Sequence, residues 1–342
     1  MTRIITHHHC IDGFHSAFIA KKYLLPYFQK NQDAIVIPLN PNDVELGLFE
    51  FDKDDIVLDL PKPQKKVFFW ADHHKTNKPK ENLEELHQTT ATHIEWRDNP
   101  SCTGLLIDYL QEQGISLLSE VLELKKILDK TDTANYTPKE YEQCFVLPNF
   151  ENPTLLQQTI ILSAIFQTKD ANLNTEIFQG LFNLQLGSIP SQSNFFQSPF
   201  INLLAKAHFK NMEEWRTLMD DNFELDPKTK TVIQDDRKIR LKKGVPDRFY
   251  VYYKYKDSDY SVSLREKDLD KIAIGIGKNV FYNKFNPLDV GKLCKTVGKM
   301  FGKGAGGGHK DIGGCEVKKD NTDAALKYIL DEIHKAQELA RK

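Results

Sequence analysis

The first 135 residues alternate between short apolar runs and segments with helical spacing, and this alternation restricts the fold more than any other feature of the chain. The apolar runs predict five strands, at residues 3–6, 34–39, 56–60, 67–71 and 93–96. Amphipathic spacing predicts three helices, at residues 13–28, 103–113 and 117–128. Strands that alternate with helices are typical of a parallel sheet, so we predict an α/β fold.

The rest of the chain has a different pattern. Residues 135–222 have mostly helical spacing, and residues 226–236 are polar and rich in turn formers, which predicts a linker. Predicted strands follow at 248–255, 260–264 and 312–317, and predicted helices at 288–300 and 322–342. We therefore expect a parallel-sheet domain at 1–134, a helical connector or extension at 135–236 and a smaller α/β domain at 237–342.

Polar clusters follow three of the predicted strands. They are the segment 7–12 after the first strand, Asp59 at the end of the third, and Asp72, His73 and His74 after the fourth. In an open parallel sheet, ligands bind beyond the carboxyl ends of the strands. A single aspartate at a strand end is more often a cap or turn residue, but that interpretation does not account for three strand ends that each carry such side chains.

These side chains are suited to metal binding. Carboxylate and imidazole groups together suit Mn²⁺, Co²⁺, Fe²⁺ or Zn²⁺. Two such ions about 3.5–4 Å apart can hold an attacking hydroxide and polarise a phosphoryl oxygen. One carboxylate must bridge the ions, and Asp59 is the candidate because it is the only acidic residue at the end of its strand. The residues therefore predict a metal-dependent phosphoesterase site.

A glycine-rich segment near the C-terminus predicts an anion site. Glycines at 302, 304 and 306–308 leave backbone amides open to close approach, because no Cβ obstructs them. A glycine run alone is most often a flexible loop. However, His309 and a predicted strand directly follow the glycines, which argues against a merely flexible loop. Arg265 could also bind a phosphate through two hydrogen bonds.

Four ordered motifs resemble one known family. The triplet DHH at 72–74 resembles the name-giving motif of the DHH phosphoesterase superfamily, and HHHCIDGF at 7–14 is similar to its first motif. The strand at 56–60 resembles the strand with the second-motif aspartate, and DKTDTA at 129–134 resembles the fourth motif. GGGH at 306–309 and SLR at 263–265 resemble the C-terminal DHHA1 domain. The resemblance covers about the first 135 and the last 100 residues.

The resemblance implies a role for each matching residue. It implies a first metal ion held by His7 and Asp59, with Cys10 at the place of a usual aspartate, and a second held by Asp12, Asp59, His73 and Asp129. His74 would contact the scissile phosphate or protonate the leaving group, and Asp72 would orient the histidines. The substrate-binding residues would be Arg265, Gly306, Gly307, Gly308 and His309.

Several of these assignments leave alternatives open. His8 could replace His7, Asp132 could replace Asp129, and Cys10 could be a non-ligand beside a single-metal site. The resemblance implies two divalent ions, with Mn²⁺ as the expected metal. A Cys10 ligand is softer than aspartate and would favour Zn²⁺ or Fe²⁺, with Co²⁺ also compatible.

The implied function is a metal-dependent phosphodiesterase of the oligoribonuclease or cyclic-nucleotide phosphodiesterase branch. Its substrates would be short oligonucleotides, cyclic dinucleotides or related phosphonucleotides, cleaved by a metal-activated water. The net charge of −2 does not suggest a duplex-coating protein and suits a short ligand. One alternative is a RecJ-type exonuclease, which needs a basic aromatic groove for a single strand. Another is a non-catalytic replication scaffold, which the presence of nearly all the ligands disfavours.

The remaining features concern the compartment. The five cysteines are widely spaced and form no CxxC pair, which argues against a disulfide framework and a zinc ribbon and favours a reducing cytoplasm. No apolar run approaches the roughly 20 residues that span a bilayer, and the N-terminus has no signal-peptide pattern. We expect a cytoplasmic protein, with a homodimer as one possible assembly.

Overall fold

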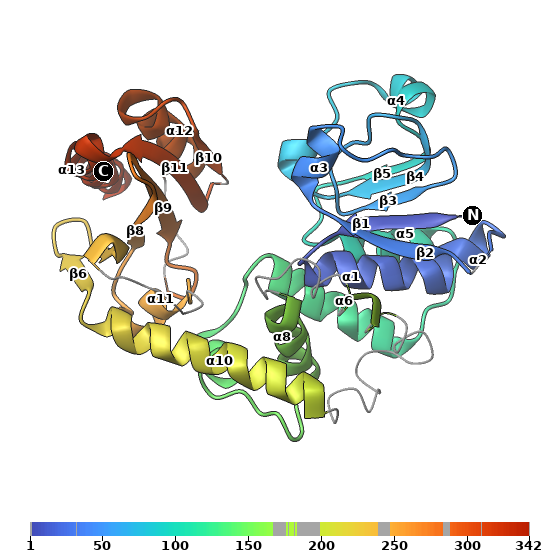
Figure 1. Cartoon of the computed structure of the whole chain (residues 1–342), viewed down its shortest axis with the longest axis horizontal. Coiled ribbons are helices and arrows are strands. Elements are labelled where there is room, and N and C mark those ends of the chain that lie inside the picture. The colour runs from blue at the N-terminus through green and yellow to red at the C-terminus, as the bar shows by residue number, and fades with distance from the viewer. Residues whose placement is uncertain are drawn as a thin grey trace. The chain divides into compact units, whose positions relative to one another are not determined.

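The structure is a computed structural model that describes residues 2–31, 33–166, 176, 178–180, 182, 199–238, 247–282, 288–308 and 310–341. The chain forms two compact units (Figure 1). The first comprises residues 1–135 and 143–207, and the second comprises residues 136–142 and 208–342. No helix in these described ranges is both long enough and apolar enough to cross a membrane.

The first unit is built on a five-stranded sheet in which all neighbouring strands run parallel. The strand order is β2-β1-β3-β4-β5. The strands are β1 (Arg3–His7), β2 (Ile35–Leu39), β3 (Ile56–Leu58), β4 (Val67–Asp72) and β5 (Ala91–Trp96). Every residue of β3 is buried, as expected for a central parallel strand covered on both faces. The predicted parallel α/β sheet is confirmed, strand by strand.

Helices cover this sheet. Figure 1 shows α1 and α6 on one side of it and α3 and α4 on the other. Val44 of α3 packs against Val57 and Trp70 of the sheet, whereas α5 and α8 pack against α1 and α6. The helices are α1 (Ile11–Ile19), α2 (Leu25–Tyr27), α3 (Pro41–Glu45), α4 (Leu83–Thr89), α5 (Cys102–Glu112), α6 (Ser119–Asp132) and α8 (Leu155–Phe166).

The strand register positions the candidate site. Ile4 of β1 pairs with Ile56 of β3, and Ile56 pairs with Phe69 of β4. Because these strands are parallel, their carboxyl ends lie at one edge of the sheet. Beyond β3 the backbone N–H of Asp59 donates to the carbonyl of Ala71, 3.0 Å away, which ties the end of β3 to β4. The three polar clusters therefore emerge side by side.

The second unit contains a six-stranded mixed sheet of order β10-β11-β9-β8-β7-β6, in which only β7 and β8 pair in parallel. The strands are β6 (Phe223–Asp226), β7 (Thr231–Asp235), β8 (Tyr260–Asp268), β9 (Lys271–Lys278), β10 (Gly306–Gly308) and β11 (Ile312–Lys318). Residues of β8, β9 and β11 form one core with α12 (Val290–Phe301) and α13 (Thr322–Arg341). The smaller C-terminal α/β domain is thus confirmed as an α/β structure.

Two local predictions in this unit are wrong. Residues 226–236 are not a linker, because β6 and β7 form an antiparallel hairpin there and β7 is largely buried. Residues 248–255 do not form a strand but contain α11 (Tyr250–Lys254), whose Val251 and Tyr252 pack on Val232 of β7. The aromatic residues favour a strand locally, but this tertiary packing overrides the preference. The predicted domain boundaries near 134 and 236 stay predictions.

A buried ion pair joins three segments of the second unit. Arg216 of α10 (Pro199–Asp220) donates to Asp247 Oδ2 over 2.9 Å, and Tyr141 of α7 (Pro138–Tyr141) donates to the same oxygen over 2.5 Å. Asp247 is 2% exposed, and burial raises the pKa of its carboxyl group despite these two donors. The carboxylate therefore depends on its partners for its charge.

Replacing Arg216 with Met should lower the free energy of unfolding by about 3–5 kcal/mol, because it leaves the buried carboxylate without its cation. The double variant Arg216→Met/Asp247→Asn should recover part of that loss, because the uncompensated charge is then absent. Urea unfolding followed by circular dichroism measures both. A double variant that is no more stable than Arg216→Met would contradict this account.

Candidate functional site

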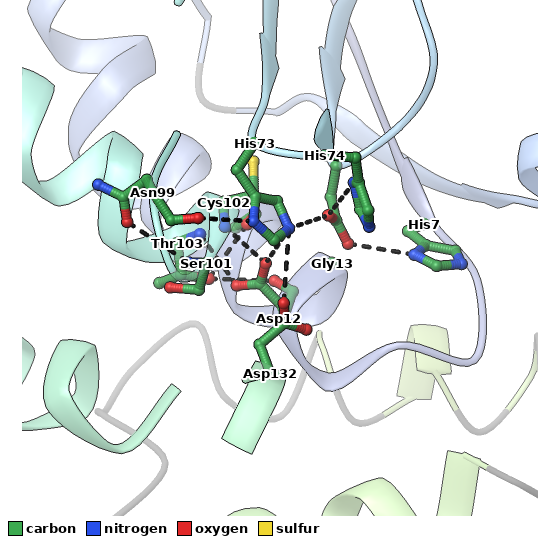
Figure 2. Close-up of polar contacts among 12 residues, drawn as sticks. His7, Asp12, Gly13, His73, His74, Asn99, Ser101, Cys102, Thr103 and Asp132 are labelled. Atoms are coloured by element: carbon green, nitrogen blue, oxygen red, sulfur yellow. Dashed lines mark hydrogen bonds and ion pairs between the residues drawn. The ribbon is translucent and has the colours of Figure 1, made fainter. Parts of the chain in front are cut away.

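Residues from three strand ends meet around the carboxylate of Asp59; Figure 2 labels His7, His73 and His74 among them. Its Oδ2 lies 3.2 Å from His7 Nδ1, and its Oδ1 lies 3.4 Å from His73 Nε2 and 3.7 Å from His74 Nδ1. Asp59 is 1% exposed and has a φ of 56°, a left-handed conformation that aspartate adopts more readily than most residues. The end of β3 thus turns sharply and holds this carboxylate among three imidazoles.

Two further carboxylates face His73 from helices. Its Nε2 lies 3.8 Å from Asp12 Oδ2, in the first turn of α1, and 3.6 Å from Asp132 Oδ2, at the end of α6 (Figure 2). One ligand atom each of Asp12, His73 and Asp132 lie within 4.8 Å of one another. Asp132 was the alternative to Asp129 in the sequence, and the structure places Asp132 beside His73.

Asp129 makes different contacts. Its Oδ1 accepts a hydrogen bond from Ser101 Oγ at 2.5 Å, and its Oδ2 lies 2.9 Å from Lys125 Nζ. It belongs to none of the potential metal-binding groups found among the described residues. Asp129, one helical turn before Asp132, therefore binds the N-cap residue of α5 and a lysine of its own helix, α6.

Two more potential metal-binding groups share Asp59. One contains His7, Cys10 and Asp59, and the other contains Asp59, Asp72, His73 and His74. Burial and the charges of Asp59, Asp132 and Asp12 raise the pKa of the Cys10 thiol. His8 lies outside these groups: it is 5% exposed, and its ring centroid lies 3.6 Å from that of His9. The geometry thus favours His7 over His8.

Asp72 is fully buried and organises the DHH turn. Its Oδ1 accepts hydrogen bonds from His74 Nδ1 at 2.7 Å and from the backbone N–H of His73 at 2.9 Å. Its Oδ2 accepts from Asn77 Nδ2 at 2.7 Å. Although burial lowers the pKa of His74, the hydrogen bond to Asp72 and the charges of Asp59 and Asp72 give a net rise. Asn77 is a partner that the sequence pattern did not indicate.

Backbone groups before and within the first turn of α5 hold two other site residues. The N–H groups of Cys102 and Thr103 donate to the two carboxylate oxygens of Asp12, over 2.7 and 2.9 Å. The carbonyl of Asn99 accepts from His73 Nδ1 at 3.0 Å, which leaves Nε2 directed at the carboxylates (Figure 2). Backbone partners leave no trace in residue types, so the sequence analysis missed them. Only Ser101, a typical N-cap residue, could have indicated where α5 begins.

The site carries an excess of buried negative charge. Burial and the charges of Asp12 and Asp59 raise the pKa of Asp132 to about 7, and burial together with Asp59 raises that of Asp12. Burial lowers the pKa of His73, but the Asp59, Asp12 and Asp132 carboxylates outweigh it and raise the value to about 10. For Asp59, burial opposes ionisation, yet His7 and His73 hold its pKa well below the usual range. Such a cluster favours binding of a cation.

Two atoms of the cluster are buried without a hydrogen-bond partner: Asp59 Oδ1 and His73 Nε2. Their separation of 3.4 Å brings them close, but the contact does not have the geometry of a hydrogen bond. Buried polar atoms without partners are uncommon and call for an explanation such as an ion. The donor set of carboxylates, imidazoles and one thiol fits a transition-metal ion.

The predicted substrate-binding residues lie in the second unit. Arg265 and Gly306 line a cavity of about 400 Å³, together with Ser263, Lys267 and other residues of β8, β9 and β11. The guanidinium group of Arg265 lies 3.3 Å from Asp236 Oδ2. Gly307 and Gly308 belong to β10, which pairs with β11, so these glycines form a strand rather than a free loop. His309 lies outside the described residues.

The chain was compared with family models, curated proteins and solved structures, and only solved structures are similar to it. No family model matches the sequence, and no curated protein matches it. Among solved structures, the chain is similar to the pGpG-specific phosphodiesterase PggH from Vibrio cholerae, with a TM-score of 0.69 and 17% identity over 98% of this chain and 100% of that one.

Two other structures are more distant. RecJ from Thermus thermophilus, in complex with Mn²⁺, has a TM-score of 0.53 and 12% identity over 98% of this chain and 52% of the RecJ chain. A DHH domain described as a member of a family of ribosomal proteins has a TM-score of 0.52 and 12% identity over 98% of this chain and 87% of that one. The chain therefore has the fold of the DHH phosphoesterases, and the resemblance of its motifs to that superfamily is confirmed at the level of the fold.

Proposed function

We propose that this chain is a metal-dependent phosphodiesterase whose active site is the cluster around Asp59. The observation that carries the proposal is a pair of buried atoms without a hydrogen-bond partner, Asp59 Oδ1 and His73 Nε2, beside the carboxylates of Asp12 and Asp132. A divalent cation would give both atoms a partner and compensate the buried negative charge.

The overlapping groups support two cation positions that share Asp59. His7, Cys10 and Asp59 would hold the first cation. The second would be held by Asp12, His73 and Asp132, with Asp132 in place of the predicted Asp129. Asp59 would be the shared ligand, because its Oδ1 lies 3.4 Å from His73 Nε2. Mn²⁺ suits the carboxylates and imidazoles, and a Cys10 thiolate would shift the preference towards Zn²⁺ or Fe²⁺. When bound, such cations polarise a phosphoryl oxygen and lower the pKa of water.

The chain's own residues supply proton transfer and orientation. His74 is partly exposed, and its Nδ1 is held by the buried carboxylate of Asp72, which fixes the orientation of the ring. The raised pKa of His74 favours the protonated form, which can donate to the leaving oxygen as a general acid. Asp72 acts through His74 and the backbone of the DHH turn rather than on the substrate.

A short nucleotide is the favoured substrate class. The similar structure PggH is a pGpG-specific phosphodiesterase, and the net charge of −2 does not suggest a surface that tracks a long strand. The RecJ alternative needs exposed aromatic residues that stack on bases, but Phe209 and Trp215 of α10 are only 6% and 1% exposed. They belong to the core, so they do not support a single-strand groove.

A hydrolysis screen with added metal ions tests the proposal. The purified chain with Mn²⁺, Zn²⁺ or Co²⁺ should cleave linear dinucleotides or cyclic dinucleotides faster than long single strands or pyrophosphate. Preferential cleavage of long single strands would favour the RecJ alternative. The absence of hydrolysis with every substrate and metal would contradict the enzymatic function.

Asp59→Asn should lower metal content and turnover by more than about 100-fold, because the shared carboxylate is lost. Asparagine tolerates positive φ, so the variant should keep the fold. Elemental analysis and dinucleotide hydrolysis measure the two losses. Asp54→Asn is the matched control: Asp54 pairs with Lys30 and is half exposed. A folded Asp59→Asn variant with full activity would refute the shared-ligand assignment.

Mn²⁺ affinity should rise with pH, at least about tenfold between about pH 6 and about pH 8. The reason is that Asp132, with a pKa of about 7, and His73, with a pKa of about 10, must release protons to bind the cation. Calorimetric titration in buffers of different ionisation enthalpy counts the released protons. Asp132→Asn should release fewer. Binding that is independent of pH would contradict this assignment.

Arg265 and the strand Gly306–Gly308 are proposed to bind a second phosphate or the base of the substrate. Arg265→Ala should then raise KM about tenfold or more and leave bound metal unchanged, because the side chain lies in the second unit. Steady-state kinetics with metal analysis measures both. Lys254→Ala removes a cation of the same unit that pairs with Asp220, and it serves as the control. Loss of metal in Arg265→Ala would contradict the assignment of substrate binding, and not metal binding, to Arg265.

A further inference from the structure

Asp129 is connected to the candidate metal site without belonging to it. It lies on α6, three residues before Asp132, and its Oδ1 accepts the hydroxyl hydrogen of Ser101 at 2.5 Å. Its Oδ2 is fixed by Lys125, 2.9 Å away. A carboxylate with both oxygens engaged in this way is a rigid anchor rather than an available ligand.

Ser101 links Asp129 to the start of α5. It is fully buried and is the N-cap of the helix, where its Oγ accepts from the backbone N–H of Gly104 at 2.9 Å. Because the Ser101 hydroxyl hydrogen is directed at Asp129, an oxygen lone pair is available for Gly104. The hydrogen bond to Asp129 therefore fixes both the rotamer of Ser101 and the first turn of the helix.

The same turn and the residues before it hold two proposed metal ligands. Cys102 and Thr103 donate their N–H groups to the carboxylate of Asp12, and the Asn99 carbonyl accepts from His73 Nδ1 (Figure 2). A shift of residues 99–103 would move Asp12 and His73 at once. Partners of metal ligands set ligand orientation, and their loss typically weakens metal affinity about 10–100-fold.

We propose that Asp129 is a positioning residue for the metal site, acting through Ser101 and the first turn of α5 on Asp12 and His73. The inference rests on the proposed metal-dependent function. It assigns Asp129 a structural link to the metal ligands in place of the ligand role implied by the resemblance.

Gly104 provides a way to disturb this link without removing any of its groups. A methyl group at this position would lie 2.3 Å from Asp129 Oδ1 and 2.8 Å from Ser101 Oγ. Gly104→Ala would thus displace the Asp129 carboxylate, although alanine itself is favoured over glycine in a helix. This variant keeps every proposed metal ligand and the charge of Asp129.

The test is calorimetric titration of the full chain with Mn²⁺. Asp129→Ala should weaken binding about 10–100-fold, and Gly104→Ala should do the same. Asp129→Asn should bind within about threefold of the wild type, because its amide oxygen still accepts the Ser101 hydroxyl and Lys125 keeps Asp108 as a partner. Thermal unfolding of each metal-free variant verifies the fold. If Asp129→Ala does not fold, Gly104→Ala and Asp129→Asn decide the question.

Asp132→Asn in the same titration separates this inference from the proposed function. Unchanged Mn²⁺ affinity in Asp132→Asn would refute the second proposed cation position. Loss of affinity in Asp132→Asn, with wild-type affinity in Asp129→Ala and Gly104→Ala, would overturn only the positioning role. Equal losses in Asp129→Asn and Asp129→Ala would also overturn it, because a ligand role requires the charge whereas a positioning role requires only an acceptor.

Discussion

The parallel register of β1, β3 and β4 underlies the whole arrangement of the first unit. Parallel pairing brings the carboxyl ends of these strands to one edge, where the chain leaves the sheet at His7, Asp59 and Asp72. His7, Asp59 and the DHH turn stand at or just beyond strand ends, whereas Asp12 and Asp132 reach the cluster from α1 and α6. A one-residue slip of β3 would exchange the side chains of its two faces and displace Asp59.

The proximity of several carboxylates makes it unfavourable for all of them to be ionised at once, and this repulsion determines which ions the site binds. Closely spaced carboxylates raise one another's pKa values, as at the buried Asp12 and the partly exposed Asp132, while His73 gains affinity for a proton. A proton on His73 is one way to compensate the charge, and a divalent cation is the other. The competition between them explains why metal binding and pH are expected to be linked.

The architecture around the cluster is organised through backbone groups as much as through side chains. Asp12 is held by the N–H groups of α5, His73 by the Asn99 carbonyl and Asp59 by a backbone bond to β4. Rigid elements thus supply the orientation that a metal site needs. In the second unit, Arg265 is likewise held by Asp236, in a separate cavity of about 400 Å³.

Residue patterns alone were enough to predict the parallel sheet of the first unit, because all five of its strands follow from apolar runs. They also identified most residues that surround Asp59, since strand ends are visible in the pattern. They did not show which of Asp129 and Asp132, three residues apart on one helix, lies beside His73, because that position depends on how α6 packs against α5. They also predicted a strand for residues that form α11, where contacts with β7 outweigh local preference. Those points were settled by the folded chain, because backbone partners and helix packing join residues that are far apart in the sequence.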